Sequence, residues 1–120
     1  MKKLLVFSAI LILFACGHSE DDVPENIIPK EEFVDLLVNI QLMESYCQNK
    51  YVRPDLYKDL LVNSIDSLLK ENGRTIEEYE ESFEFYSMRP KVMFQVYEEV
   101  LERINTLELE TNAVAAEKSE

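Results

Sequence analysis

The stretch Asn72-Gly73-Arg74-Thr75-Ile76-Glu77-Glu78 ends one amphipathic segment and begins the next. Gly73 suits the left-handed residue that commonly follows the last turn of a helix. Thr75 and Glu78 fit a capping box, in which the threonine side chain accepts a hydrogen bond from the third helical amide and the glutamate side chain accepts one from the threonine amide. The stretch therefore predicts a helix end and a helix start separated by a short loop.

The segment downstream of the capping box is predicted to be the third of four helices. Its core stripe consists of Ile76, Tyr79, Phe83 and Tyr86. Phe85 lies roughly opposite this stripe, so it either packs against another helix or is exposed for a partner. Arg89-Pro90 ends the helix, because the residue before a proline avoids the helical region.

A fourth helix is expected from about Lys91 to Leu107, since proline is favoured at the first position of a helix. Its apolar residues cover about half of the circumference and Phe94 widens the arc, so this helix is expected to be the most buried of the four. The apolar residues are Val92, Met93, Val96, Tyr97, Val100, Leu101, Ile104 and Leu107. Residues 111–120 are small or charged and are expected to form a disordered tail.

Two more amphipathic segments precede the loop at Gly73. The first begins near Pro29, ends near Asn49, and places Phe33, Leu36, Leu37, Ile40, Met43 and Cys47 on one face. Val34, Val38, Leu42 and Tyr46 widen its apolar surface, so this helix is expected to touch more than one neighbour. The second restarts at Arg53-Pro54-Asp55, with Leu56, Tyr57, Leu60, Leu61, Ile65, Leu68 and Leu69. The predicted fold class is therefore all-α, a small bundle of about four helices over residues 28–110.

The N-terminus has the composition of a secretory leader. Lys2 and Lys3 precede an apolar run of about eleven residues, which is too short to span a bilayer as an uncleaved anchor. The run ends in Leu13-Phe14-Ala15-Cys16, which resembles the lipobox of bacterial lipoproteins. This resemblance implies a signal peptide over residues 1–15, cleavage before Cys16 and acylation of that cysteine. Ordinary secretion after Ala15 is the alternative.

Residues 16–27 are expected to form a flexible tether behind the lipidated cysteine. Glu20, Asp21 and Asp22 form a short acidic run, and Pro24 discourages regular structure. The run is either a solvated linker or an address, because it resembles the surface-export signal of Bacteroidota lipoproteins. The expected location is the cell envelope, lipid-anchored at the outer membrane, on the periplasmic or the surface-exposed leaflet.

The strong negative charge excludes several classes of partner. The formal net charge is −12, and removing Lys2 and Lys3 with the leader makes it −14. Such a surface repels nucleic acid and anionic lipid head groups. With Cys16 acylated, Cys47 has no partner for an internal disulfide and is expected to be a packed core thiol.

Two features invite an enzymatic or metal-dependent interpretation. Glu44 projects into the apolar stripe of the first helix, where it is either a buried functional carboxylate or reaches solvent or an arginine such as Arg53 or Arg89. The third helix carries an acidic face, Glu77, Glu78, Glu81 and Glu84. Against a metal site, His18 is the only histidine and lies in the tether, so the Glu-x-x-His pairs of di-iron bundles are absent. We therefore predict no catalytic residues, no metal site and no cofactor.

Three blocks of residues carry a resemblance to a known family. They are Pro29-Lys-Glu-Glu-Phe33, Glu71-Asn-Gly-Arg-Thr-Ile-Glu-Glu-Tyr79, and Ser82-Phe-Glu-Phe-Tyr86 followed by Pro90, Tyr97 and Val100. Over about residues 28–104 the chain resembles the domain of unknown function 4296 family of small Bacteroidota lipoproteins. Phe85 departs from the tyrosine that is common at its position in that family. The resemblance implies an envelope location and carries no established activity.

These observations leave two function classes. The first is a membrane-anchored, non-enzymatic interaction module, an assembly or chaperone-like factor that binds a protein or peptide through an apolar groove. Its candidate partner-binding residues are Phe85, Tyr86 and Phe94. The second is a metal-dependent binder or enzyme that uses Glu44 or the acidic helix face. The sequence favours the first class and indicates neither the partner nor the oligomeric state.

Overall fold

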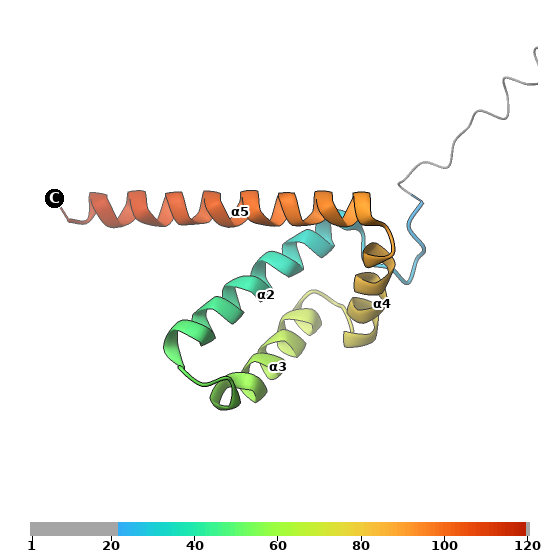
Figure 1. The fold of residues 1–120 in the computed structure, drawn as a ribbon, viewed down its shortest axis with the longest axis horizontal. Coiled ribbons are helices and arrows are strands. Elements are labelled where there is room, and N and C mark those ends of the chain that lie inside the picture. The colour runs from blue at the N-terminus through green and yellow to red at the C-terminus, as the bar shows by residue number, and fades with distance from the viewer. Residues whose placement is uncertain (1–21, 120) are drawn as a thin grey trace, which may run out of the picture.

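The computed structural model describes residues 22–119, and in them the chain forms four α-helices and no strands (Figure 1). The helices are α2 (Lys30–Lys50), α3 (Pro54–Glu71), α4 (Ile76–Ser87) and α5 (Pro90–Glu117). The predicted all-α fold and its three helix breaks are confirmed. The leader, Cys16 and His18 lie outside the described residues. No described helix is both long enough and apolar enough to cross a membrane.

Helix α2 lies at the centre of the molecule. It packs against α3, which runs back beside it, and against α5, which crosses it, while the short α4 joins α3 to α5 (Figure 1). Its buried residues are Phe33, Val34, Leu36, Leu37, Val38 and Cys47. Helix α5 buries only Met93, Val96 and Val100 of its own residues. The prediction that the last helix is the most buried is therefore wrong, because much of α5 extends beyond the other helices.

The loop between α3 and α4 has the predicted geometry. Gly73 has a φ of 68°. The amide of Arg74 donates to the carbonyl of Leu69 at 2.9 Å, and the amide of Gly73 donates to the carbonyl of Lys70 at 3.0 Å. These two bonds are those of a Schellman motif. Thr75 then makes both capping-box bonds with Glu78. The loop thus ends one helix and starts the next with few unpaired backbone groups.

An ion pair holds this loop against the start of α2. The guanidinium of Arg74 donates to both carboxylate oxygens of Glu32, at 2.8 and 2.6 Å, and lies 3.6 Å from Glu78. The hydrogen bond from Arg74 lowers the pKa of Glu32 below its usual value. Because the folded-state pKa is the lower one, this stabilisation is present above the unfolded pKa and is lost as the pH falls through the folded pKa.

The segment before α2 packs onto α4. Ile27 and Ile28 are buried, and Val23 packs against the same core. The buried amide of Ile28 donates to the Ser82 hydroxyl at 2.8 Å, and the Tyr86 hydroxyl donates to the carbonyl of Ile28 at 2.7 Å. Packing therefore begins at Val23, inside the segment expected to form a tether at residues 16–27, because apolar side chains there reach the core. Residues 16–21 of the expected tether lie outside the described residues.

Aromatic rings fill the space between α2 and α4. Phe33 of α2 lies 4.8 Å from the ring centre of Tyr86, 5.9 Å from that of Tyr79 and 6.3 Å from that of Phe83. Burial raises the pKa values of Tyr79 and Tyr86. Phe83 closes the outer side of this cluster and remains partly exposed. The predicted core stripe of α4 is therefore the face that packs on α2, with Phe83 at its edge.

Helix α5 continues past its expected end at Leu107 as far as Glu117. The expectation of a disordered tail from residue 111 is corrected over these residues. All of residues 105–117 are exposed, so burial does not hold this part of the helix. Its alanines, leucines and glutamates have high helix propensity, and they extend a helix that is already nucleated.

Ser82→Ala is expected to lower the free energy of unfolding by about 1 to 3 kcal/mol, because it leaves the buried amide of Ile28 without an acceptor. Urea unfolding followed by circular dichroism measures this change. The matched control is Ser87→Ala, at an exposed position of the same helix, where a change within about 0.5 kcal/mol is expected. Equal effects at the two serines would contradict the role given to Ser82.

Candidate functional site

An apolar stripe along α2 becomes progressively exposed. Val34 is fully buried, whereas 39% of Leu42 and 59% of Tyr46 are exposed. Each step of four residues turns by about 40°, so this row of side chains winds around the helix from Val34 to Tyr46. The rise in exposure shows the row leaving the covered face of α2, which still buries Cys47 near the end of the helix.

Helix α5 carries a matching stripe with the same gradient. Val96 is fully buried, whereas 41% of Leu107 and 50% of Val114 are exposed. Spacings of eleven and seven residues place these three side chains on one face of a helix. The two stripes therefore pack together at one end of the bundle and separate toward the other, as the ribbons of α2 and α5 do in Figure 1.

Two ion pairs join α2 and α5 at the end of the bundle where the two helices pack together. The Lys30 ammonium lies 2.7 Å from the carboxylate of Glu99, and Asp35 pairs with Arg103. Both pairs join α2 to α5 beside the buried valines of the two stripes. The crossing of the helices is thus fixed by apolar contact and by charge, which leaves the far ends apart.

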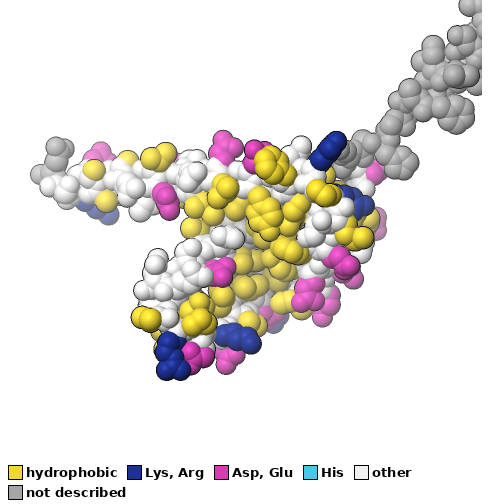
Figure 2. All heavy atoms as spheres, viewed as in Figure 1, with side chains coloured by type: hydrophobic (Ala, Val, Ile, Leu, Met, Phe, Trp, Pro, Cys, Tyr) yellow, Lys and Arg dark blue, Asp and Glu magenta, His cyan; other side chains and the backbone are white. Residues whose placement is uncertain are grey.

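We call the opening between the two exposed stripes the α2–α5 groove. Leu42 on one wall and Leu107 and Thr111 on the other line an open hollow of about 600 Å³. Tyr46 and Leu42 also border a second hollow with Leu60 of α3, so the apolar surface continues onto the hairpin. Figure 2 shows hydrophobic side chains gathered where α5 meets the α2–α3 hairpin. Soluble proteins rarely leave a contiguous apolar surface open unless it has an interaction to make.

The charge around the groove is acidic. Glu108 lines the hollow beside Leu107, and Glu102 and Glu110 line a neighbouring hollow that shares Leu107 with it. Among residues 22–119 none of these three carboxylates has an ion-pair partner. The basic residues nearest the closed end, Lys30 and Arg103, are already paired. The α5 side of the groove therefore combines apolar residues with unpaired carboxylates, whereas on the α2 side the Lys50 ammonium lies over the Tyr46 ring.

The structure separates the three predicted partner-binding residues. Tyr86 is buried and bonded to Ile28, so it is unavailable to a partner. Phe85 packs edge-on against Tyr86 and lies under the guanidinium of Arg89, 3.6 Å from its ring centre. Phe94 is exposed on α5. Of the three, only Phe94 presents a free aromatic face, and it lies outside the α2–α5 groove.

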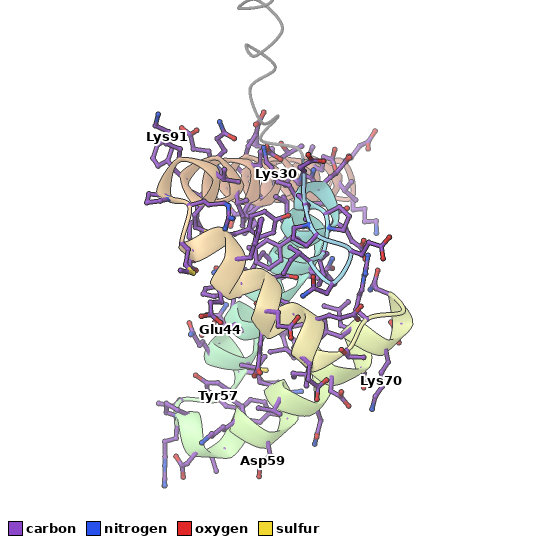
Figure 3. All side chains as sticks on the ribbon, turned by 90° about the vertical axis from the view of Figure 1, so that its right-hand side faces the viewer. Lys30, Glu44, Tyr57, Asp59, Lys70 and Lys91 are labelled. Carbon is purple, nitrogen blue, oxygen red and sulfur yellow. The ribbon has the colours of Figure 1, made fainter. Side chains whose placement is uncertain are left out.

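The carboxylates considered for metal binding or catalysis are dispersed. Glu44, labelled in Figure 3, accepts a hydrogen bond from Gln48 at 3.3 Å. Arg53 pairs with Asp55. On α4, Glu78 serves the capping box and Glu81 accepts a bond from Asn26. Residues 22–119 contain no group of three or more histidine, cysteine, aspartate or glutamate side chains that could hold a metal ion.

Cys47 is buried and free. Its thiol lies beside Met43 and Tyr46 at the edge of the hairpin hollow. This agrees with the predicted core thiol. The side chain packs as a small hydrophobe.

Leu42, Leu60 and Leu107 line these hollows, although their positions in the sequence predict only that they lie on the apolar faces of their helices. The pattern of apolar residues along a helix does not show where a neighbouring helix ends. Val34, Val38, Leu42 and Tyr46 are expected to widen the apolar surface of the first helix, and in the structure Leu42 and Tyr46 of this set remain exposed.

Residues 24–110 match the family model described as a domain of unknown function, DUF4296. The chain belongs to the DUF4296 family. No curated protein and no solved structure matches it. The DUF4296 match includes Leu42, Leu60 and Leu107, whereas residues 111–117 of the α5 wall lie beyond it.

Phe85→Ala is expected to lower the free energy of unfolding by about 2 to 3 kcal/mol, somewhat less than the loss of a fully buried phenylalanine. The reason is that the ring packs against Tyr86 and under Arg89. Phe94→Ala is the matched control, with a change within about 0.5 kcal/mol, because Phe94 is exposed. Thermal and urea unfolding measure both. A melting temperature unchanged by Phe85→Ala would refute its packing role.

Proposed function

We propose that this DUF4296 protein is a lipid-anchored envelope lipoprotein whose helical domain binds a protein or peptide in the α2–α5 groove. In this proposal the domain acts as a non-enzymatic assembly or chaperone-like factor. The observation that carries the proposal is the parallel rise in exposure along the two apolar stripes of α2 and α5. A folded domain that leaves both walls of such an angle open has surface to bury on binding.

The anchor part of the proposal rests on the sequence. The lysines, the short apolar run and Leu13-Phe14-Ala15-Cys16 follow the pattern of a lipoprotein signal peptide. Each acyl methylene that enters the bilayer contributes about 0.8 kcal/mol, so two or three chains on Cys16 anchor a protein stably. The proposed location is the outer membrane, with the domain held close to the lipid surface.

The alternative class, a metal-dependent binder or enzyme using Glu44 or the acidic face, has less support. Glu44 has an amide partner, Gln48, beside it. The acids of α4 are exposed or engaged in helix capping and loop bonds. No described observation favours this class over the groove.

Labelled palmitate is expected to enter the protein in growing cells, and Cys16→Ala should abolish both the label and membrane fractionation. Cys47→Ala is the matched cysteine control and should retain both, because Cys47 is a buried thiol of the helical domain. Wild-type protein that takes up no label and washes off membranes would refute the anchor.

A photo-cross-linking residue at Leu107 is expected to form covalent adducts with another protein in living cells, because this position lies in the groove. The same residue at Leu101 is the control, since Leu101 is exposed on α5 away from the groove residues. Immunoblotting under denaturing conditions reveals the adducts. Equal adduct yields at the two positions, or none at Leu107, would contradict the proposed interaction module.

A further inference from the structure

We infer that the α2–α5 groove takes one amphipathic α-helix of a partner protein, with apolar side chains on one face and lysine or arginine on the flanks. This inference rests on the proposed function, because it names the partner chemistry of the same groove. It draws on the shape of the walls, on their polar groups and on the charge of the rim.

The shape of the groove suits a helix. Its α5 wall beyond the core, residues 105–117, is about 20 Å long at 1.5 Å per residue, which matches three to four turns of a ligand helix. The α5 wall presents side chains at helical spacing, with Leu107 and Thr111 facing Leu42 of α2 across the opening, and the exposed Val114 continues the α5 stripe beyond them. A third helix laid in the angle would bury both stripes as α2 and α5 bury each other at the closed end.

The polar groups of the groove also favour a helix over an extended peptide. An extended peptide needs partners for its backbone amides and carbonyls, and it commonly finds them at the edge of a sheet. Residues 22–119 contain no strand that could offer such an edge. A helix satisfies its own backbone and needs only apolar contact from the groove floor.

The rim selects the charge of the partner. Glu102, Glu108 and Glu110 border the groove without an ion-pair partner among the described residues. Lysine or arginine on the flanks of a docked helix would lie near these carboxylates, while acidic flanks would be repelled. Complementary charge of this kind speeds association and excludes wrong partners.

The same charge argues against a second copy of this chain as the occupant. The protein carries a formal net charge of −12, and docking of two copies would bring acidic surfaces together. Helix α5 itself bears Glu98, Glu99, Glu102, Glu108 and Glu110 around its circumference. A partner with basic flanks avoids this repulsion.

The groove faces away from the proposed anchor. The first described residues lie beside the junction of α4 and α5, whereas the groove opens toward the opposite end of α5 (Figure 1). Five residues lie between Cys16 and Asp22, so the two are at most about 20 Å apart along an extended chain. A short tether therefore holds the closed end of the bundle near the lipid and leaves the groove accessible to a partner.

The test uses the full chain purified from membranes and placed in nanodiscs of neutral phosphatidylcholine, which does not attract a cationic peptide. The probe is a fluorescent 18-residue amphipathic helix of leucine and lysine, and fluorescence anisotropy measures its binding. A peptide with glutamate in place of every lysine serves as the charge control. The lysine peptide should bind at least tenfold more tightly than the glutamate peptide.

Two groove variants separate docking from non-specific charge attraction. Leu107→Glu and Leu42→Glu should each weaken binding of the lysine peptide at least tenfold, although each adds a negative charge. Leu101→Glu adds the same charge at an exposed position outside the groove and should not weaken binding. Leu107 lies outside the buried core, so its variant is expected to keep the wild-type melting temperature.

Four results would overturn the inference. The first three are no binding of the lysine peptide, equal binding of the two peptides, and unchanged affinity in Leu107→Glu. The fourth is a dimer in sedimentation that Leu107→Glu dissolves, which would make a second copy the occupant. The proposed function fails separately, through the palmitate and cross-linking experiments. Adducts at Leu107 without binding of the lysine peptide would support the proposed interaction module and contradict the inference that its partner is a basic helix.

Discussion

The buried N–H and C=O groups of Ile28 must each find a hydrogen-bond partner, and the arrangement of the whole bundle depends on where these partners come from. Both come from α4, as the hydroxyls of Ser82 and Tyr86. A buried peptide group left unpaired costs more than an ordinary hydrogen bond contributes, so the segment before α2 and the helix α4 are held in one relative position. Pro90 follows α4 after two residues, and α5 therefore starts from a fixed point beside the start of α2.

This starting point explains the groove. Helix α5 begins next to the first turns of α2, packs on them through Val96 and Val100, and then continues straight while α2 turns away into the hairpin with α3. The ion pair between Lys30 and Glu99 fixes the near end of the crossing. Two straight helices that cross at one end must diverge at the other, so the outer parts of both apolar stripes have no partner within the described fold.

Local chemistry made much of this fold predictable. Gly73, Thr75 and Pro90 determine their own conformations or those of their immediate neighbours, so the helix breaks, the capping box and the helix count could be derived from residue order. The set of buried residues could not be derived from residue order, because burial depends on the direction in which each helix leaves its neighbour. Thus Tyr86, a candidate contact for a partner, is buried in the core. Leu107, which lines the groove, has the sequence pattern of a core residue. The helix through residues 111–117 was missed because propensity without burial left little apolar pattern to detect.

The unsupported end of α5 makes one wall of the groove unlike the other. Helix α2 is held on both sides by packing, whereas residues 105–117 depend on backbone hydrogen bonds and on the preceding turns for their order. Such a segment opens by local unfolding at a much smaller free energy than the core requires. If a ligand binds the groove as proposed, its affinity depends on the fraction of molecules in which this end of α5 is helical. Ala113, Ala115 and Ala116 raise that fraction through helix propensity alone, so they would tune the proposed binding without touching the ligand.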